Sequence, residues 1–170
     1  MFTKQAKTPD EWTLRQLRQI AQYQFGEEFA AILVPDGVQI TISKKTKKVR
    51  EVLLGENRIA TMRPTDGYFS IGLFGADRII SATKSPKQRV IVQNDVSEFI
   101  IEGRNVFAKH VVAVDTNIRP EDEVIVVNEK DKLLAIGKAQ LSAEYMLAFE
   151  KGIAVKVRYG AKKLNKKEKK

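Results

Sequence analysis

The chain opens with apolar residues at helical spacing. In TPDEWTLRQLRQIAQYQFG the apolar positions are Leu14, Leu17 and Ala21, flanked by Trp12 and Ile20. Thr8 and Glu11 fit a capping box, Pro9 fits the first helical position and Gly26 fits a helix end. The pattern therefore predicts a helix over residues 9–25 whose apolar face packs into a core.

After the turn PDG the pattern changes to alternation with many β-branched residues. This change predicts strands over 38–43, 48–54 and 58–62, followed by a short helix in FGADRIISA. The tip between the first two strands carries Lys44, Lys45, Lys47 and Lys48. A lysine run of this kind suits a solvated turn, and it also suits contact with phosphate groups.

A break in the apolar pattern at TKSPKQR indicates a boundary between two domains, residues 1–87 and 88–160. In the second domain the predicted strands are RVIVQ, NVFAKHVVAV, EVIVVN, LLAIGKAQL and IAVKVRYG. EVIVVN is apolar enough to be buried on both faces. The remaining residues, 161–170, are rich in lysine, and we expect a disordered tail.

Two short helices interrupt these strands. NDVSEFIIEG predicts one with Val96, Phe99 and Ile100 facing inward, and SAEYMLAFEKG predicts another, capped by Ser142 and ended by Gly152. Strands this short favour a small barrel, because they cannot cover two open faces. The predicted fold class is α+β, with a small α/β domain followed by a β barrel.

The net charge of +9 is unevenly distributed along the chain. Residues 1–87 hold 14 Lys and Arg against 9 Asp and Glu, residues 88–160 hold 10 against 11, and the last ten residues hold 6 against 1. A basic protein attracts polyanions, and no amphipathic segment of lipid-seeking character is visible, so nucleic acid is favoured over membrane. The alternative is that the charge serves solubility alone.

The composition argues against most enzyme chemistry. The chain has no cysteine and one histidine, His110, which excludes thiolate nucleophiles, sulfur-based zinc sites and multi-histidine metal clusters. The acidic run PEDE has no identifiable base partner, and SIGLFGAD lacks the Lys-Ser/Thr of a phosphate loop. No catalytic residue, metal or cofactor is predicted. The absence of a signal-peptide or membrane-spanning pattern predicts a cytoplasmic protein.

The second domain, PKQRVIVQNDVSEFIIEGRNVFAKHVVAVDTNIRPEDEVIVVNEKDKLLAIGKAQLSAEYMLAFEKGIAVKVRYG, resembles the PUA domain, a pseudo-barrel of RNA-modifying enzymes and ribosome-assembly factors. VREVLLGENRIATMRPTDGYFSIGLFGADRII followed by GRNVFAKHVVAVD resembles the C-terminal part of archaeosine tRNA-guanine transglycosylases, where a small α/β domain precedes the PUA domain. The catalytic barrel of those archaeal enzymes has no counterpart in this chain. The resemblance implies a non-catalytic module that binds tRNA, or an accessory subunit of a separate tRNA-modifying enzyme.

In PUA domains the RNA face is formed by the first helix, the following strand and the last strand. Carried over by position, the resemblance assigns this face to Gly103, Arg104, Asn105, Phe107, Ala108, Lys109, Lys156, Arg158 and Tyr159. Alternation places Lys156 and Arg158 on one side of the last strand. They could equally be the solvent side of a barrel on spacing alone, and Phe107 fits a core position better than a base-stacking one.

Two further functions remain open at this level. A ribosome-associated or ribosome-assembly factor would also pair a small N-terminal domain with a PUA domain and would bind rRNA. A protein-interaction subunit would use the β surface for another protein and never for RNA. The lysine tail either follows RNA phosphates or only keeps the chain soluble.

Overall fold

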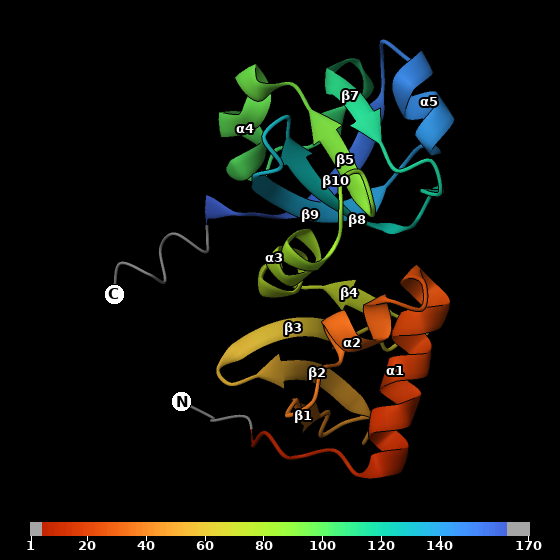
Figure 1. Cartoon of the computed structure of the whole chain (residues 1–170), viewed down its shortest axis with the longest axis vertical. Coiled ribbons are helices and arrows are strands. Elements are labelled where there is room, and N and C mark those ends of the chain that lie inside the picture. Colours follow the sequence, from red (N-terminus) through yellow and green to blue (C-terminus); the bar gives the residue numbers. More distant parts are fainter. Residues whose placement is uncertain (1–4, 163–170) are drawn as a thin grey trace. The chain divides into compact units, whose positions relative to one another are not determined.

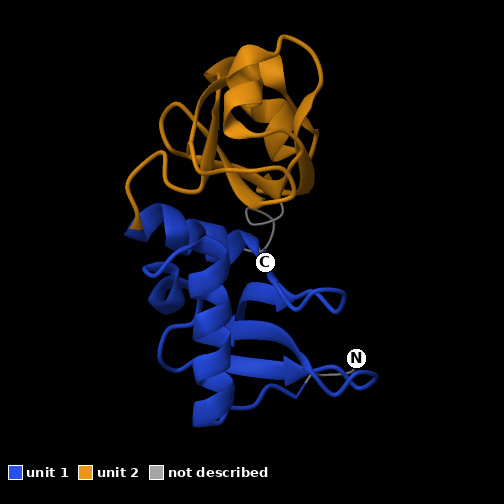
Figure 2. Cartoon of the chain, turned by 90° about the vertical axis from the view of Figure 1, so that its right-hand side faces the viewer, with its two compact units in different colours: residues 1–82 blue, residues 83–170 orange. Residues whose placement is uncertain are grey.

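The computed structural model describes residues 5–162 and divides into two compact units, residues 1–82 and 83–170 (Figure 1, Figure 2). The side chain of Arg89 fixes residues 83–87 to the second unit. Its guanidinium is fully buried, donates to the carbonyl oxygens of Thr83 and Lys87, and pairs with Asp131 at 2.7 Å. These contacts attach the linker to the second unit.

The first unit contains an antiparallel four-stranded sheet and three helices. Its elements are α1 (Glu11–Phe25), α2 (Phe29–Leu33), β1 (Gln39–Ile42), β2 (Val49–Leu54), β3 (Asn57–Met62), β4 (Phe69–Ile71) and α3 (Leu73–Ala82). The strand order is β1-β2-β3-β4. The long helix α1, the three longer strands and α3 lie where the sequence pattern predicts them, and α2 and β4 were not predicted.

The predicted N-cap of α1 is wrong, and its predicted end is confirmed. Asp10 is the N-cap, and its carboxylate accepts a hydrogen bond from the Thr13 N–H at 2.7 Å. The helix starts after Asp10 and not after Thr8, so the capping box does not form. Gly26 ends the helix with a φ of 120°. Within the helix, Leu17 is buried as predicted.

The second unit contains a six-stranded mixed sheet. Its elements are β5 (Arg89–Val92), the 3-10 helix η1 (Asn94–Val96), α4 (Ser97–Ile101), β6 (Val106–Phe107), the 3-10 turn η2 (Ala108–His110), β7 (Val111–Val114), β8 (Glu123–Asn128), β9 (Leu133–Ala139), α5 (Ala143–Ala148) and β10 (Ile153–Gly160). The strand order is β6-β10-β9-β8-β5-β7, with β5 and β8 parallel and the other pairs antiparallel.

The sheet curls into a nearly closed pseudo-barrel because its two edge strands are consecutive in the chain. The segment NVFAKHVVAV, predicted as one strand, bends at η2 into β6 and β7. The bend is held by hydrogen bonds from the Ala108 N–H to the Gly152 carbonyl and from the Gln93 N–H to the His110 carbonyl, each 3.0 Å. One half of the segment pairs with β10 and the other with β5.

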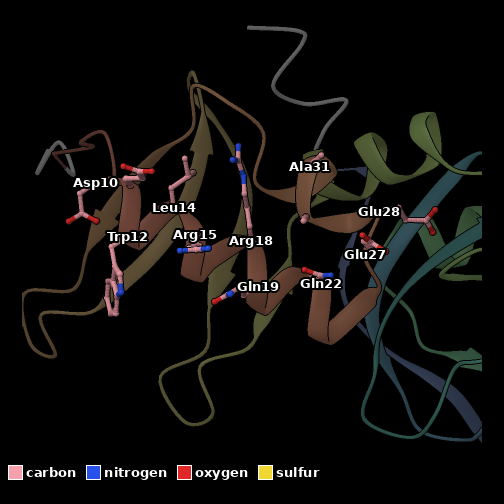
Figure 3. A pocket seen from close by; sticks show the side chains of 12 residues that line it. Asp10, Trp12, Leu14, Arg15, Arg18, Gln19, Gln22, Glu27, Glu28 and Ala31 are labelled. Carbon is pink, nitrogen blue, oxygen red and sulfur yellow. The ribbon is translucent and has the colours of Figure 1, made fainter.

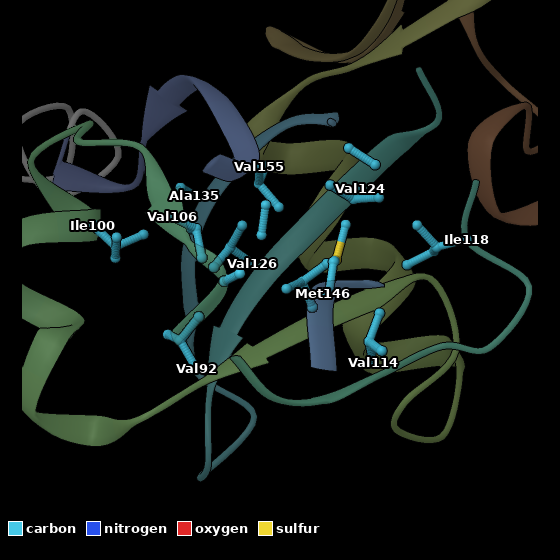
Figure 4. Packing of buried hydrophobic residues seen from close by; sticks show 14 of the residues in the cluster. Val92, Ile100, Val106, Val114, Ile118, Val124, Val126, Ala135, Met146 and Val155 are labelled. Carbon is cyan, nitrogen blue, oxygen red and sulfur yellow. The ribbon is translucent and has the colours of Figure 1, made fainter. Parts of the chain in front are cut away.

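Aliphatic side chains from the strands and both α-helices of the second unit fill the barrel (Figure 4). Val96 and Ile100 point into this core as predicted, whereas Phe99 is 54% exposed, which contradicts the inward placement. With only five residues, α4 can bury one narrow stripe, and Ile100 occupies it. Helix α5 also ends earlier than predicted, at Ala148 and not at Gly152.

The residue that follows β10 packs against the barrel. Ala161 is 5% exposed, and its N–H donates to the Leu134 carbonyl at 2.8 Å. The lysine tail predicted from residue 161 otherwise lies outside the described residues, apart from Lys162. Within residues 5–162, no helix is long and apolar enough to cross a membrane.

Candidate nucleic-acid interface

The structure brings the two halves of the predicted RNA face together along β10. Val106 and Phe107 in β6 are the antiparallel partners of Val155 and Ile153 in β10. The Asn105 side-chain oxygen extends this pairing by accepting a hydrogen bond from the Val157 N–H at 3.0 Å. Asn105 is therefore a structural bridge between the two segments, and its amide nitrogen is the part that remains for a ligand.

Gly160 allows the loop after α4 to lie directly against β10. A Cβ at Gly160 would come within 2.2 Å of the Ile101 carbonyl oxygen and 2.7 Å of the Gly103 nitrogen. Gly103 itself has a φ of 105°, a backbone conformation that other residues rarely adopt. Both glycines are thus required by geometry, and Gly103 and Arg104 are exposed residues.

The predicted face also carries exposed cations. Arg104, Lys109 and Lys156 are exposed, and Tyr159 is 36% exposed. Lys156 makes no ion pair with any other residue that the structure describes. These side chains can meet phosphate oxygens or base edges, which is the chemistry that RNA contact needs.

Arg158 has a different environment from Lys156. Its guanidinium makes a bidentate ion pair with Glu123, with nitrogen–oxygen distances of 2.9 and 2.6 Å, and the Glu123 side chain is only 1% exposed. A β-bulge between Val157 and Tyr159 breaks simple alternation along β10 at this point. The charge of Arg158 is therefore balanced inside the barrel wall, which weakens the case for it as a phosphate contact.

The apolar residues of the face divide between core and surface. Ala108 is 2% exposed and can offer only backbone to a ligand. Phe107, which the pattern placed in the core, is 46% exposed, so it is available for stacking. Phe99 is a surface residue that the sequence pattern did not predict. Its carbonyl accepts a hydrogen bond from the Arg104 N–H at 3.2 Å, so Phe99 lies beside the loop. Exposed rings next to cations suit unpaired bases.

The predicted lysine hairpin forms the tip between β1 and β2 in the first unit. Its backbone is fixed by hydrogen bonds from the Ser43 N–H to the Lys48 carbonyl and from the Lys47 N–H to the Ser43 carbonyl, each 2.9 Å. All four lysines, Lys44, Lys45, Lys47 and Lys48, are exposed. The tip presents charge without any apolar or ring surface of its own.

The groups that could do chemistry are paired structurally or dispersed. His110 Nδ1 lies 3.2 Å from the Gln93 side-chain oxygen. In the run PEDE, Glu121 pairs with Lys138 and Asp122 accepts from the Arg119 N–H. Among residues 5–162 no cluster of three His, Asp or Glu side chains could hold a metal ion.

Two domain families account for almost all of this architecture. Residues 88–160 match the PUA domain, and residues 15–86 match the family described as patch-forming domain C2 of tRNA-guanine transglycosylase. The chain therefore carries a PUA domain preceded by a C2 domain. Both were assigned from the sequence resemblance, and the comparison confirms them.

The curated relatives that combine these features are archaeal. The tRNA-guanine(15) transglycosylase of Methanobrevibacter smithii is 45% identical over 150 residues, covering 88% of this chain and 23% of the relative. That of Pyrococcus abyssi is 42% identical over 154 residues, covering 91% and 26%. The chain thus spans about a quarter of the length of these relatives, and it is similar to their C2 and PUA domains.

Solved structures share the whole two-unit fold. A hypothetical protein of Pyrococcus horikoshii aligns with a TM-score of 0.74 at 24% identity, covering 94% of this chain and 95% of that one. A conserved PUA domain protein of Thermoplasma acidophilum aligns with a TM-score of 0.63 at 19% identity, covering 93% of each. At these identities the likeness establishes the fold.

Proposed function

We propose that this chain is a tRNA-binding module that catalyses no reaction itself. The observation that carries the proposal is the sequential match to a C2 and a PUA domain, at above 40% identity to tRNA-guanine(15) transglycosylases. The exposed residues Gly103 and Arg104, together with Phe107 on β6 and Lys156 on β10, support the proposal because they combine backbone groups, cations and a ring.

The chain acts as an accessory to a separate transglycosylase-type enzyme. The support is that this chain is similar to about a quarter of each relative. That quarter consists of the C2 and PUA domains, in which we expect contact with RNA and not exchange of the base. In this arrangement the module holds tRNA, and the partner exchanges the base. Linking a second RNA contact to an enzyme raises its apparent affinity through effective concentration.

Filter binding to tRNA over a series of salt concentrations tests the proposal. With about five phosphate contacts, log affinity should fall against log salt with a slope of roughly −3.5 to −4.5. A double-stranded RNA of equal length serves as the matched control and should bind more weakly. Salt-insensitive binding, or equal affinity for the duplex, would contradict a tRNA module. Co-sedimentation with ribosomal particles at higher affinity than for tRNA would favour the ribosome-associated function instead.

A further inference from the structure

The first unit contains an open groove that the RNA face does not use. It has a volume of about 1140 Å³ and is lined by residues of α1, of the turn after it and of α2 (Figure 3). Trp12, Arg15, Gln19 and Gln22 line it from α1, and Ala31 lines it from α2. Every lining residue belongs to residues 10–31, so the groove is complete within one unit.

The exposed side of α1 beside the groove is unusual for a solvated helix. Trp12, Gln16, Gln19 and Tyr23 recur at spacings of four, three and four residues, which places them in one stripe along the helix. Trp12 is 68% exposed and Tyr23 is 78% exposed. The stripe carries no charge, although the chain is rich in lysine. Exposed tryptophan and tyrosine are the side chains most enriched at the energetic centres of protein interfaces.

The charges that line the groove are mainly acidic. Four carboxylates line it, those of Asp10, Glu11, Glu27 and Glu28, against two guanidinium groups, those of Arg15 and Arg18. Arg18 is already engaged, because it donates to the Val34 carbonyl and pairs with Asp36 at 2.6 Å.

One carboxylate, that of Asp10 at the start of the groove, is held in its charged form. The hydrogen bond from the Thr13 N–H lowers the pKa of Asp10, so this group stays ionised at neutral pH. A net acidic lining repels phosphate and attracts basic polypeptide, although the chain as a whole carries +9. The groove lining therefore differs in sign from the net charge of the chain.

From this charge complementarity we infer that the groove docks a basic amphipathic helix of a partner protein, with Trp12 as the apolar anchor. The apolar stripe of such a helix covers Trp12, and its lysine or arginine side chains meet the carboxylates that line the groove. This is the helix-in-groove mode of recognition. The inference goes beyond tRNA binding, because it assigns a protein-binding surface to the unit and does not depend on the RNA face.

The test uses the full chain and two designed helical peptides of equal length, one built from leucine and lysine and the other from leucine and glutamate. Trp12 is the single tryptophan of the chain, so its emission reports occupancy of the groove directly. We expect the lysine peptide to shift this emission and to bind at least about tenfold more tightly than the glutamate peptide, although the net charge of the chain opposes this.

Variants locate the binding by anisotropy of labelled peptides. Trp12→Ala should weaken the lysine peptide about tenfold or more, as expected for an anchor. The pair Glu27→Lys and Glu28→Lys should reverse the preference toward the glutamate peptide. Glu144→Lys with Glu150→Lys is the charge-matched control on the other unit, and it should leave the preference intact. Because Trp12 is exposed, its truncation should leave the thermal midpoint unchanged, and a circular-dichroism melt checks this.

Three results would overturn the inference. Equal binding of the two peptides would remove the charge argument. Loss of tRNA binding in Trp12→Ala, with the lysine peptide unaffected, would make the groove an RNA surface. A concentration-dependent dimer in sedimentation that Trp12→Ala abolishes would make a second copy of the chain the occupant. If tRNA binding is absent altogether while the peptide results hold, the proposed function fails and the docking groove stands.

Discussion

The two surfaces predicted to meet RNA, the face formed by residues 103–109 and β10 and the lysine hairpin, present their cations in different ways. On the face, residues 103–109 are fixed against β10 by strand pairing, by the Asn105 hydrogen bond and by the close approach at Gly160. The hairpin presents four exposed lysines on a turn that hydrogen bonds of Ser43 hold in place. We therefore expect the face to recognise the shape of an RNA, whereas the hairpin supplies only a salt-sensitive attraction to its phosphates.

The charge balance of the two regions supports this division. Near the face, carboxylates neutralise several cations through ion pairs. These pairs are Glu123 with Arg158, Glu121 with Lys138 and Glu102 with Lys162. Residues 88–160 accordingly sum to about neutral, whereas residues 1–87 carry 14 Lys and Arg against 9 Asp and Glu. Within residues 1–160, we therefore expect long-range attraction of RNA to come mainly from residues 1–87, and the face to add local contacts.

The largest effect is expected from Arg158→Ala, through stability and not through lost phosphate contact. The substitution leaves the 1% exposed Glu123 carboxylate without its bidentate partner, so the free energy of unfolding should fall by about 3 kcal/mol. Urea denaturation followed by circular dichroism measures this loss.

A double variant separates the two roles of Arg158. Replacing the pair together, as Arg158→Met with Glu123→Leu, should recover most of the lost stability, since no charge is then left buried without a partner. Its tRNA affinity should stay close to that of the unaltered chain. If Arg158→Ala instead keeps its stability and loses tRNA binding, Arg158 belongs to the RNA face, and the division between the two regions is wrong.

The second prediction concerns the hairpin. Replacing Lys44, Lys45, Lys47 and Lys48 by serine removes charge without touching the core. If all four contact phosphates, the slope of log affinity against log salt should become shallower by roughly 3. Filter binding to tRNA at several salt concentrations gives the slope. An unchanged slope would show that the hairpin is only a solvated turn.

The third prediction compares two neighbouring lysines. Lys156 and Lys138 are antiparallel partners on β10 and β9, but only Lys138 has a carboxylate partner, Glu121 at 3.0 Å. Lys156→Ala should weaken tRNA binding about threefold to tenfold and reduce the salt slope by roughly 1. Lys138→Ala is the matched control and should change affinity less. A larger effect at Lys138 would move the RNA contact away from the loop at Gly103.

Local patterns predicted most of the elements because the relevant contacts are close in sequence. Helix α1 shows repeated helical spacing, and β8 is an apolar run whose first five residues are buried. The short elements α2 and β4, of five and three residues, contain too few positions to show a period. The bend at η2 was missed because its hydrogen bonds come from Gly152 and Gln93, which are distant in the chain.

The partner of Arg158 could not be predicted from spacing. Glu123 lies 35 residues away, and the two meet only when β8, β9 and β10 are in register and β10 is bulged. One signal was available, because Glu123 is the single charged residue of the buried strand EVIVVN. A carboxylate at a buried position requires a cation, and Arg158 is the cation that reaches it.

The smallest expected effect concerns pH and the ion pair that joins the loop after α4 to the end of β10. The hydrogen bond and the charge of Lys162 lower the pKa of Glu102 below its ordinary value of 4.5. A carboxyl group with a lower pKa in the folded chain stabilises the fold above its unfolded pKa, and this contribution is lost as the pH falls through the folded pKa. Glu102→Gln should therefore lower the thermal midpoint slightly at pH 7 and not at all in strong acid. Glu98→Gln, within α4, is the control. A difference that persists in strong acid would show that Glu102 acts by packing and not by charge.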